Sequence, residues 1–359
     1  MKKYKISVYA ICKNEEKFVK RWVNSMKEAD EIYVLDTGST DNTVNELKKF
    51  GVNVKTETFT PWRFDVARNK SLELVPNDTD ICVCTDLDEV FESGWREKLE
   101  NSYKEGARVN YTYNWHINED GVPDVSFMLN KIHPRTNYKW THPVHEVLTP
   151  LKKEEFVRIP SIILNHYPDN TKSRGSYLEL LELSVKEDPF DDRNMHYLGR
   201  EYMYYKKWDK CIETLKKHLT LESATWNLER AASMRYIARS YLNLGDILEA
   251  EKWYKLAIDE ASNLRDGYVE LAMLYNNQSK WLDSIIYLIK ALSIRNKDMV
   301  YVNEVFSWDH TIDDLLSINY YNLGIYDLSL YHVNKAIDLK RDDERLKNNK
   351  KLIEQKQNF

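Results

Sequence analysis

The run ICVCTDLD, residues 81–88, decides the fold of the first half of this 359-residue chain. Residues 81–85 are apolar or β-branched, as in a strand that is buried on both faces. Asp86 and Asp88 follow directly, and side chains two positions apart point the same way from an extended chain. The run therefore predicts a core strand that brings two carboxylates to one edge of a sheet.

Upstream of this run, short apolar segments alternate with stretches of helical pattern. We expect strands at Ile6–Ile11, Glu31–Leu35, Val52–Thr56 and Ile81–Thr85, and helices at Glu15–Met26, Thr43–Phe50 and Phe64–Leu74. Strands that alternate with helices are typical of a parallel α/β sheet. Such sheets bind their ligands outside the carboxyl ends of the strands.

Polar clusters stand at three of these carboxyl ends. Residues 12–15 (CKNE) follow the first strand, residues 36–39 (DTGS) follow the second, and residues 86–88 (DLD) follow the fourth. The second cluster predicts a tight turn before a helix, with Asp41 or Thr43 as the N-cap. We therefore expect the three clusters to converge on one rim of the sheet.

Asp86 and Asp88 are candidate ligands for a divalent cation. Carboxylate oxygens are hard ligands that suit Mg²⁺ or Mn²⁺. A cation held there could bridge the two phosphates of a nucleotide diphosphate and neutralise the charge that develops when it leaves. The alternative is structural, because Asp-x-Asp pairs also cap turns and begin helices.

Together with Arg68-Asn69, which lies on the helix expected before the fourth strand, these clusters resemble the nucleotide subsite of the family-2 inverting glycosyltransferases with a GT-A fold. The resemblance reaches to about Asn165 and rests on several motifs in family order. It implies a UDP-type donor of a hexose or N-acetylhexosamine, with Asp36 near the base or ribose, Asp86 near the ribose and metal, and Asp88 on the metal. The expected nucleotide-sugar-binding residues are Cys12, Asn14, Glu15, Asp36, Gly38, Ser39, Arg68, Asn69, Asp86, Trp140 and Arg174.

Two of these residues carry explicit alternatives. Trp140 would stack on a sugar face, but an aromatic side chain in an α/β sheet more often belongs to the core. Arg174, in a polar loop near the domain junction, would close over the diphosphate, and the alternative is a solvated linker charge.

Residues 135–146 (RTNYKWTHPVHE) resemble an Arg…Trp…Val-His-Glu segment of the same subfamily. A neutral imidazole is a good ligand for Mn²⁺, so His145 would complete the metal site begun by Asp88. His166 is the competing candidate. The alternative for either histidine is a satisfied position in the core or in a turn.

An inverting transfer needs one base that takes the acceptor's proton as it attacks the anomeric carbon. Glu146 is the first choice because it follows a candidate metal ligand. Its alternative role is to orient His145 or Arg135. Asp120, in the sequence NEDG, is instead expected in a hairpin turn.

From Asp192 onward the pattern changes to paired helices with an internal repeat. Tyr202, Tyr241, Tyr275 and Tyr320 align at offsets of 39, 34 and 45 residues, with small residues three positions before and nine positions after each tyrosine. Sixteen positions after the tyrosine stand Ala257, Ala291 and Ala336, whereas the first repeat has His218. The pattern resembles four tetratricopeptide repeats with insertions, whose tyrosines pack between helices.

We expect an α/β GT-A catalytic domain at 1–170, a linker at 171–191, an all-α repeat domain at 192–340 and a charged helix or tail at 341–359. This order resembles bacterial proteins in which tetratricopeptide repeats follow the catalytic domain, among them peptide and protein glycosyltransferases, including bacteriocin S-glycosyltransferases. It implies a peptide or protein acceptor, modified on Cys or Ser/Thr, that contacts the repeats. The alternatives are dimerisation through the repeats, a cell-surface glycan or lipid-linked sugar as acceptor, and a non-enzymatic repeat scaffold.

The charge, the cysteines and the apolar segments of the chain limit which kinds of partner and environment we expect. The net charge of −5, with interspersed signs, gives no support to nucleic-acid binding. The four cysteines lack zinc-site spacing and are expected to be reduced core thiols of a cytoplasmic protein. No apolar segment approaches the roughly 18 residues that span a membrane.

Overall fold

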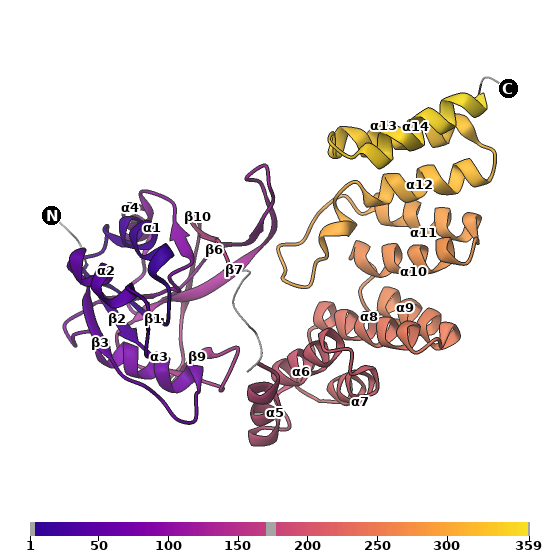
Figure 1. The fold of residues 1–359 in the computed structure, drawn as a ribbon. Helices are drawn as coiled ribbons and strands as arrows, with labels where there is room; N and C mark the ends of the chain where they lie inside the picture. Colours follow the sequence, from indigo (N-terminus) through magenta and orange to yellow (C-terminus); the bar gives the residue numbers. More distant parts are fainter. Residues whose placement is uncertain (1–3, 170–176, 358–359) are drawn as a thin grey trace. The chain divides into compact units, whose positions relative to one another are not determined.

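The computed structural model describes residues 4–169 and 177–357. The chain divides into two compact units, one of Met1–Glu187 with Met299–Tyr301 and the other of Asp188–Asp298 with Val302–Phe359 (Figure 1). Each unit is described by itself.

The first unit is built on an eight-stranded mixed sheet in the order β3-β2-β1-β4-β7-β6-β10-β5. The strands are β1 (Ile6–Cys12), β2 (Glu31–Asp36), β3 (Asn53–Thr56), β4 (Ile81–Cys84), β5 (Glu89–Phe91), β6 (Arg108–Ile117), β7 (Pro123–Pro134) and β10 (Phe156–His166). The first four strands are parallel to one another, and β7 pairs with β4 antiparallel. The carboxyl ends of β1, β2 and β4 therefore meet at one edge, as the alternating pattern predicted.

Both faces of this sheet are covered. The helices are α1 (Glu16–Met26), α2 (Thr43–Lys49), α3 (Phe64–Glu73), α4 (Trp95–Ser102) and α5 (Tyr177–Glu187), and a separate hairpin joins β8 (Tyr138–Thr141) to β9 (Val147–Pro150). Alternate residues of β1 pack against α1 and α4 on one face, while Tyr9 packs with residues of α3 and with Trp140 and Leu148 on the other. Cys82 and Cys84 share this second face, as expected, and all four cysteines are free and buried.

The second unit consists of successive helices, coloured from magenta-red to yellow in Figure 1. They are α6 (Asp192–Tyr204), α7 (Trp208–His218), α8 (Asn227–Asn243), α9 (Ile247–Glu260), α10 (Arg265–Asn277), α11 (Trp281–Ser293), α12 (Thr311–Asn322), α13 (Tyr326–Leu339) and α14 (Glu344–Gln357). Four helix pairs, from α6 with α7 to α12 with α13, correspond to the four predicted repeats.

The small residues of the repeat pattern lie where paired helices touch. The Ser284 hydroxyl of α11 donates to the carbonyl of Ala272 in α10 at 2.9 Å. At the equivalent positions one repeat later, Ser329 of α13 donates to the carbonyl of Ser317 in α12 at 2.8 Å. Contacts this short require small side chains at the crossing, which is why the sequence repeats them.

The expected fold class, a GT-A-like α/β sheet followed by tetratricopeptide-like helices, is confirmed. Part of the stretch predicted as a linker forms α5, and residues 170–176 lie outside the described residues, so the domain boundaries stay a prediction.

Asp120 lies in the turn between β6 and β7, where Gly121 N donates to Asn118 O at 3.0 Å. In the described parts of the chain, no helix has both the length and the apolar character needed to cross a membrane.

Candidate active site

The turns after β1 and β2 form one hydrogen-bonded unit. The strands pair with Cys12 opposite Asp36. Asn14 has a positive φ of 54°, and its side-chain oxygen accepts from the backbone N–H of Thr40 at 2.7 Å. In return Asn14 N donates to the Ser39 hydroxyl at 2.8 Å, and Glu15 N donates to the Thr43 hydroxyl at 2.7 Å. Two of the three predicted polar clusters are therefore brought together.

Asp36 is the centre of the second turn. Its carboxylate is 1% exposed and accepts from the backbone N–H groups of Gly38 at 3.3 Å and Ser39 at 3.1 Å. Gly38 has a φ of 103°, and a Cβ there would meet the Thr58 side chain at 3.0 Å. Only glycine fits this position without strain. The Cys12 thiol donates to Asp36 at 3.7 Å, and burial together with the Asp36 charge raises its pKa, so it stays protonated.

The Arg68 guanidinium of α3 joins two of the predicted site carboxylates. It is 2% exposed, and it donates to Asp86 at 2.6 Å and to Glu146 at 2.9 Å. A third nitrogen lies 3.6 Å from the sulfur of Cys84. Burial raises the pKa of Asp86, but this effect is limited because the side chain is 35% exposed. The charges of Arg68 and Lys131 outweigh it and hold the pKa of Asp86 well below the usual range.

Lys131 and Glu89 belong to the same group, although the sequence analysis did not find them. The ammonium of Lys131, on β7, lies 3.6 Å from Asp86 and 3.9 Å from Glu89. Glu89 is 2% exposed, accepts from the backbone N–H of Asp86 at 2.8 Å, and has a pKa raised by burial. The available signal was a lone lysine within an otherwise largely apolar strand. We call Asp86, Asp88, Glu89 and Glu146 the carboxylate cluster.

Asp88 lies beside His166, at the end of β10. The distance from His166 Nε2 to Asp88 Oδ2 is 3.5 Å, while His166 Nδ1 lies 3.1 Å from the carbonyl of Trp115. The Trp115 ring stacks on the imidazole with 4.5 Å between centroids. Burial lowers the pKa of His166, but the hydrogen bond and charge of Asp88 outweigh it and raise the pKa. Among the described residues Asp88 Oδ1 makes no hydrogen bond.

Trp140 and Asn69 lie behind this group. The Trp140 ring is 1% exposed, donates to the Tyr9 hydroxyl at 2.9 Å, and lies 5.6 Å from the Arg68 guanidinium. The Asn69 amide exchanges two hydrogen bonds of 2.9 Å with the backbone of Trp140. This burial favours the core alternative for Trp140, whose contribution to a ligand runs through the placement of Arg68.

Two predicted site residues remain, His145 and Arg174. His145 has a positive φ of 50°, and its ring lies 5.9 Å from the ring of Tyr177 in α5. Arg174 lies outside the described residues.

Comparison with known proteins gives one family match. Residues 7–153, which lie in the first unit, match the model of Glycosyl transferase family 2. The match includes every predicted site residue except Arg174, and it ends before His166. No curated protein matches the chain.

Solved structures of tetratricopeptide-repeat proteins are similar to part of the chain. The C-terminal part of a repeat protein from Cytophaga hutchinsonii is 16% identical, with a TM-score of 0.43 over 51% of this chain and 66% of the other. A repeat protein from Parabacteroides merdae is 16% identical, with a TM-score of 0.39 over 51% and 67%. A thermophilic repeat protein from Thermus thermophilus is 18% identical, with a TM-score of 0.36 over 50% and 89%.

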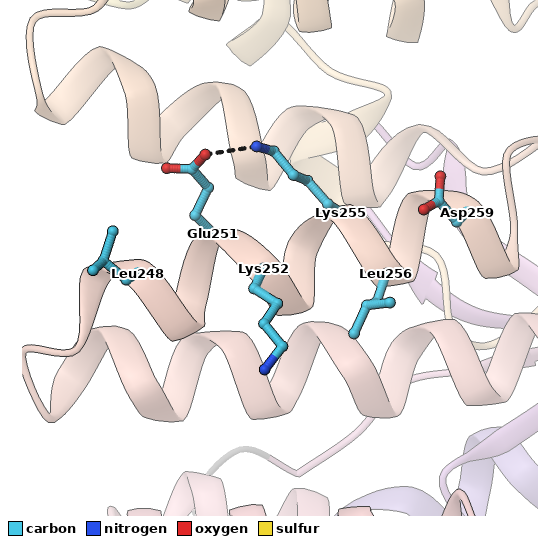
Figure 2. Close-up of a pocket in the computed structure, with 6 residues that line it drawn as sticks. All are labelled: Leu248, Glu251, Lys252, Lys255, Leu256 and Asp259. Carbon is cyan, nitrogen blue, oxygen red and sulfur yellow. Dashed lines mark hydrogen bonds and ion pairs between the residues drawn. The ribbon is translucent and has the colours of Figure 1, made fainter.

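The repeat unit carries a hollow of about 310 Å³. Figure 2 shows that its lining comes from one face of α9, on which Glu251 and Lys255 form an ion pair of 2.7 Å. The residues that line it are Leu248, Glu251, Lys252, Lys255, Leu256 and Asp259. Because a single exposed helix face cannot surround a ligand, we assign it no binding role.

Replacing Arg68 with Met should destabilise the first unit strongly. The change leaves Asp86 and Glu146 without their shared counter-charge, which for a buried ion pair costs about 3–5 kcal/mol. Arg63→Met is the matched control, because Arg63 also pairs with two carboxylates but is 23% exposed, and it should cost about 1 kcal/mol or less. Urea unfolding of both variants measures the difference, and equal losses would contradict a central role for Arg68.

Proposed function

We propose that this protein is an inverting glycosyltransferase that moves a hexose or N-acetylhexosamine from a UDP-sugar, with a divalent metal, to a Cys or Ser/Thr side chain of a peptide or protein. The observation that carries the proposal is that the two carboxylates of Asp86-Leu87-Asp88 have different neighbours. Arg68 and Lys131 neutralise Asp86, whereas Asp88 Oδ1, at the same sheet edge, makes no hydrogen bond within the part of the chain that the structure describes.

The charge balance supports a metal-bound diphosphate. The carboxylate cluster has four acidic groups, and two cations, Arg68 and Lys131, pair with them. The cluster therefore has an excess of negative charge. A diphosphate would be repelled by this excess of negative charge. A bound Mn²⁺ or Mg²⁺ would cancel this excess of negative charge and stabilise the leaving diphosphate. The donor set of carboxylate and imidazole fits such an ion.

His166 is the better-placed histidine ligand. Its Nδ1 faces the Trp115 carbonyl, which cannot donate, so Nδ1 carries the hydrogen. In the neutral ring Nε2 then presents its lone pair toward Asp88, 3.5 Å away. Two lone pairs at this distance favour a cation between them. The sequence left His145 and His166 open, and this orientation supports His166.

Glu146 remains the proposed base. Arg68 holds Oε1 at 2.9 Å, while Oε2 makes no hydrogen bond among the described residues. A carboxylate fixed through one oxygen can accept a proton at the other without losing its position. The acceptor hydroxyl or thiol would give up its proton there as it attacks the anomeric carbon.

Asp88→Asn should abolish metal-dependent turnover while leaving the fold intact. Losing about 3 kcal/mol of charge stabilisation corresponds to a fall of about 100-fold or more. UDP release from a panel of UDP-sugars with Mn²⁺, compared with excess EDTA, measures it. Asp120→Asn, in the exposed turn between β6 and β7, is the control and should stay at the wild-type rate. Normal turnover by Asp88→Asn would remove this residue from the metal site.

His166→Ala and His145→Ala separate the two histidines. We expect the Mn²⁺ concentration for half-maximal UDP release to rise by about 10–100-fold in His166→Ala, as for the loss of a metal ligand or its immediate partner. His145→Ala should need the wild-type concentration. The reverse order would assign the ligand to His145, and no change in either variant would exclude both.

Ending the chain after Glu187 tests the role of the repeats. A repeat array presents an extended surface of the kind that holds polypeptides. The shortened chain should still release UDP, because the anomeric chemistry is local, but it should no longer glycosylate a library of Cys-, Ser- and Thr-containing peptides. Circular dichroism and cooperative melting verify that the first unit is folded. Full peptide transfer by a folded, shortened chain would favour a glycan or lipid-linked acceptor.

A further inference from the structure

A buried cluster of metal-ligand side chains lies in the first repeat, within the second unit. It consists of His196 on α6, His218 at the end of α7 and Glu229 on α8. Both histidines are 0% exposed, and Glu229 is 5% exposed. One potential ligand atom from each lies within 4.8 Å of the other two. Three separate helices therefore bring these groups to one point in the core.

His218 breaks the pattern of the repeats. Sixteen residues after the repeat tyrosine, the other repeats place Ala257, Ala291 and Ala336 in the contact between helices, and each is buried. The first repeat places an imidazole there. A buried polar ring costs free energy unless its nitrogens find partners, so the exchange of a methyl group for a histidine needs a specific compensation.

One hydroxyl orients both rings. Ser233 Oγ lies 2.7 Å from Nδ1 of His196 and 3.1 Å from Nδ1 of His218. A hydroxyl oxygen has two lone pairs, so it can accept N–H from both rings at once. Both Nε2 atoms then carry lone pairs, so each ring can bind a metal through Nε2.

The far side of His218 is directed at Glu229. His218 Nε2 makes no hydrogen bond among the described residues, and it lies 3.6 Å from Glu229 Oε1. Metal–ligand bonds of about 2.1 Å at tetrahedral angles place neighbouring ligand atoms about 3.4 Å apart. The observed separation therefore has the size that a shared ion requires.

We propose that His196, His218 and Glu229 form a zinc site, with water as the fourth ligand. Two imidazoles and one carboxylate are a ligand set that Zn²⁺ takes in proteins, and the absence of thiolates disfavours softer ions. Two cations, Arg200 and Arg235, lie near enough to His196 to act on its charge. The charge of Arg235 is balanced by Glu270 and Glu304 at 2.6 and 3.3 Å.

Zinc at this position would fasten α6 and α7 to α8, the first helix of the next repeat. A repeat array depends on contacts between neighbours, so its end repeat is the one most in need of an added constraint. This metal requirement belongs to the repeat unit and does not depend on the transferase activity or on the ion at Asp88.

The test uses the full chain with the Asp88→Asn substitution, so that the other metal site does not contribute. After EDTA treatment and its removal, the protein is loaded with Zn²⁺ and passed through a desalting column, and bound zinc is measured by elemental analysis. We expect one zinc per chain and a melting temperature about 5–10 °C above that of the stripped protein at a hundredfold excess over the dissociation constant. Co²⁺ should give the visible absorption of tetrahedral coordination.

His218→Ala is the decisive variant, because alanine is the residue of the other repeats and should fold. It should bind no zinc and show no shift in melting temperature. Glu229→Gln, which keeps the shape of the side chain, provides a second variant if the first is unstable. His332→Ala is the control, because its ring pairs with Asp313 at 2.7 Å in another repeat, and it should retain one zinc. No retained zinc in the parent chain, or equal zinc in all variants, would overturn the proposal.

Discussion

The buried guanidinium of Arg68 is the interaction on which the first unit depends. It is held by Asp86 after β4 and by Glu146 after β8, and its own helix α3 covers one face of the sheet. A charge at 2% exposure is tolerated only where anions meet it with good geometry. The three segments are therefore fixed relative to one another by one charge. The backbone exchange between Asn69 and Trp140 adds a second link between α3 and the β8–β9 hairpin.

Local patterns were enough to predict the parallel half of this sheet. Each parallel strand carries its own apolar run, and each turn carries its own polar residues, as in residues 36–39. The site itself was only partly predictable. Lys131, on β7, was missed, and His166, on β10, was one of two candidate histidines between which the sequence did not decide. Their nearness to Asp86 and Asp88 depends on pairing across the sheet, with β7 beside β4 and β10 beside β5. No short window of sequence contains that information.

In the repeats too, the sequence predicted local contacts but not contacts between distant segments. The spacing of tyrosines and small residues predicted the helix pairs, because each pair repeats the same close contact, as in Ser284 with Ala272. His218 was visible only as a departure from the pattern. Its partners, Ser233 and Glu229, lie on the next helix pair, so their meeting depends on how one repeat stacks on the next.

For Asp86 and Asp88, the spacing in the sequence determines which way the two side chains point but not which charged groups they meet. Both side chains leave the end of β4 at the same sheet edge, yet Asp86 meets two cations whereas Asp88 meets one imidazole. Each cation lowers the negative potential that a metal would feel, so the neutralised Asp86 is the weaker ligand and the stronger support for Arg68. The motif is therefore asymmetric. Its first carboxylate stabilises the folded edge of the sheet, and its second is the one that we propose as the ligand of the ion, because the neighbours of each were set by distant strands.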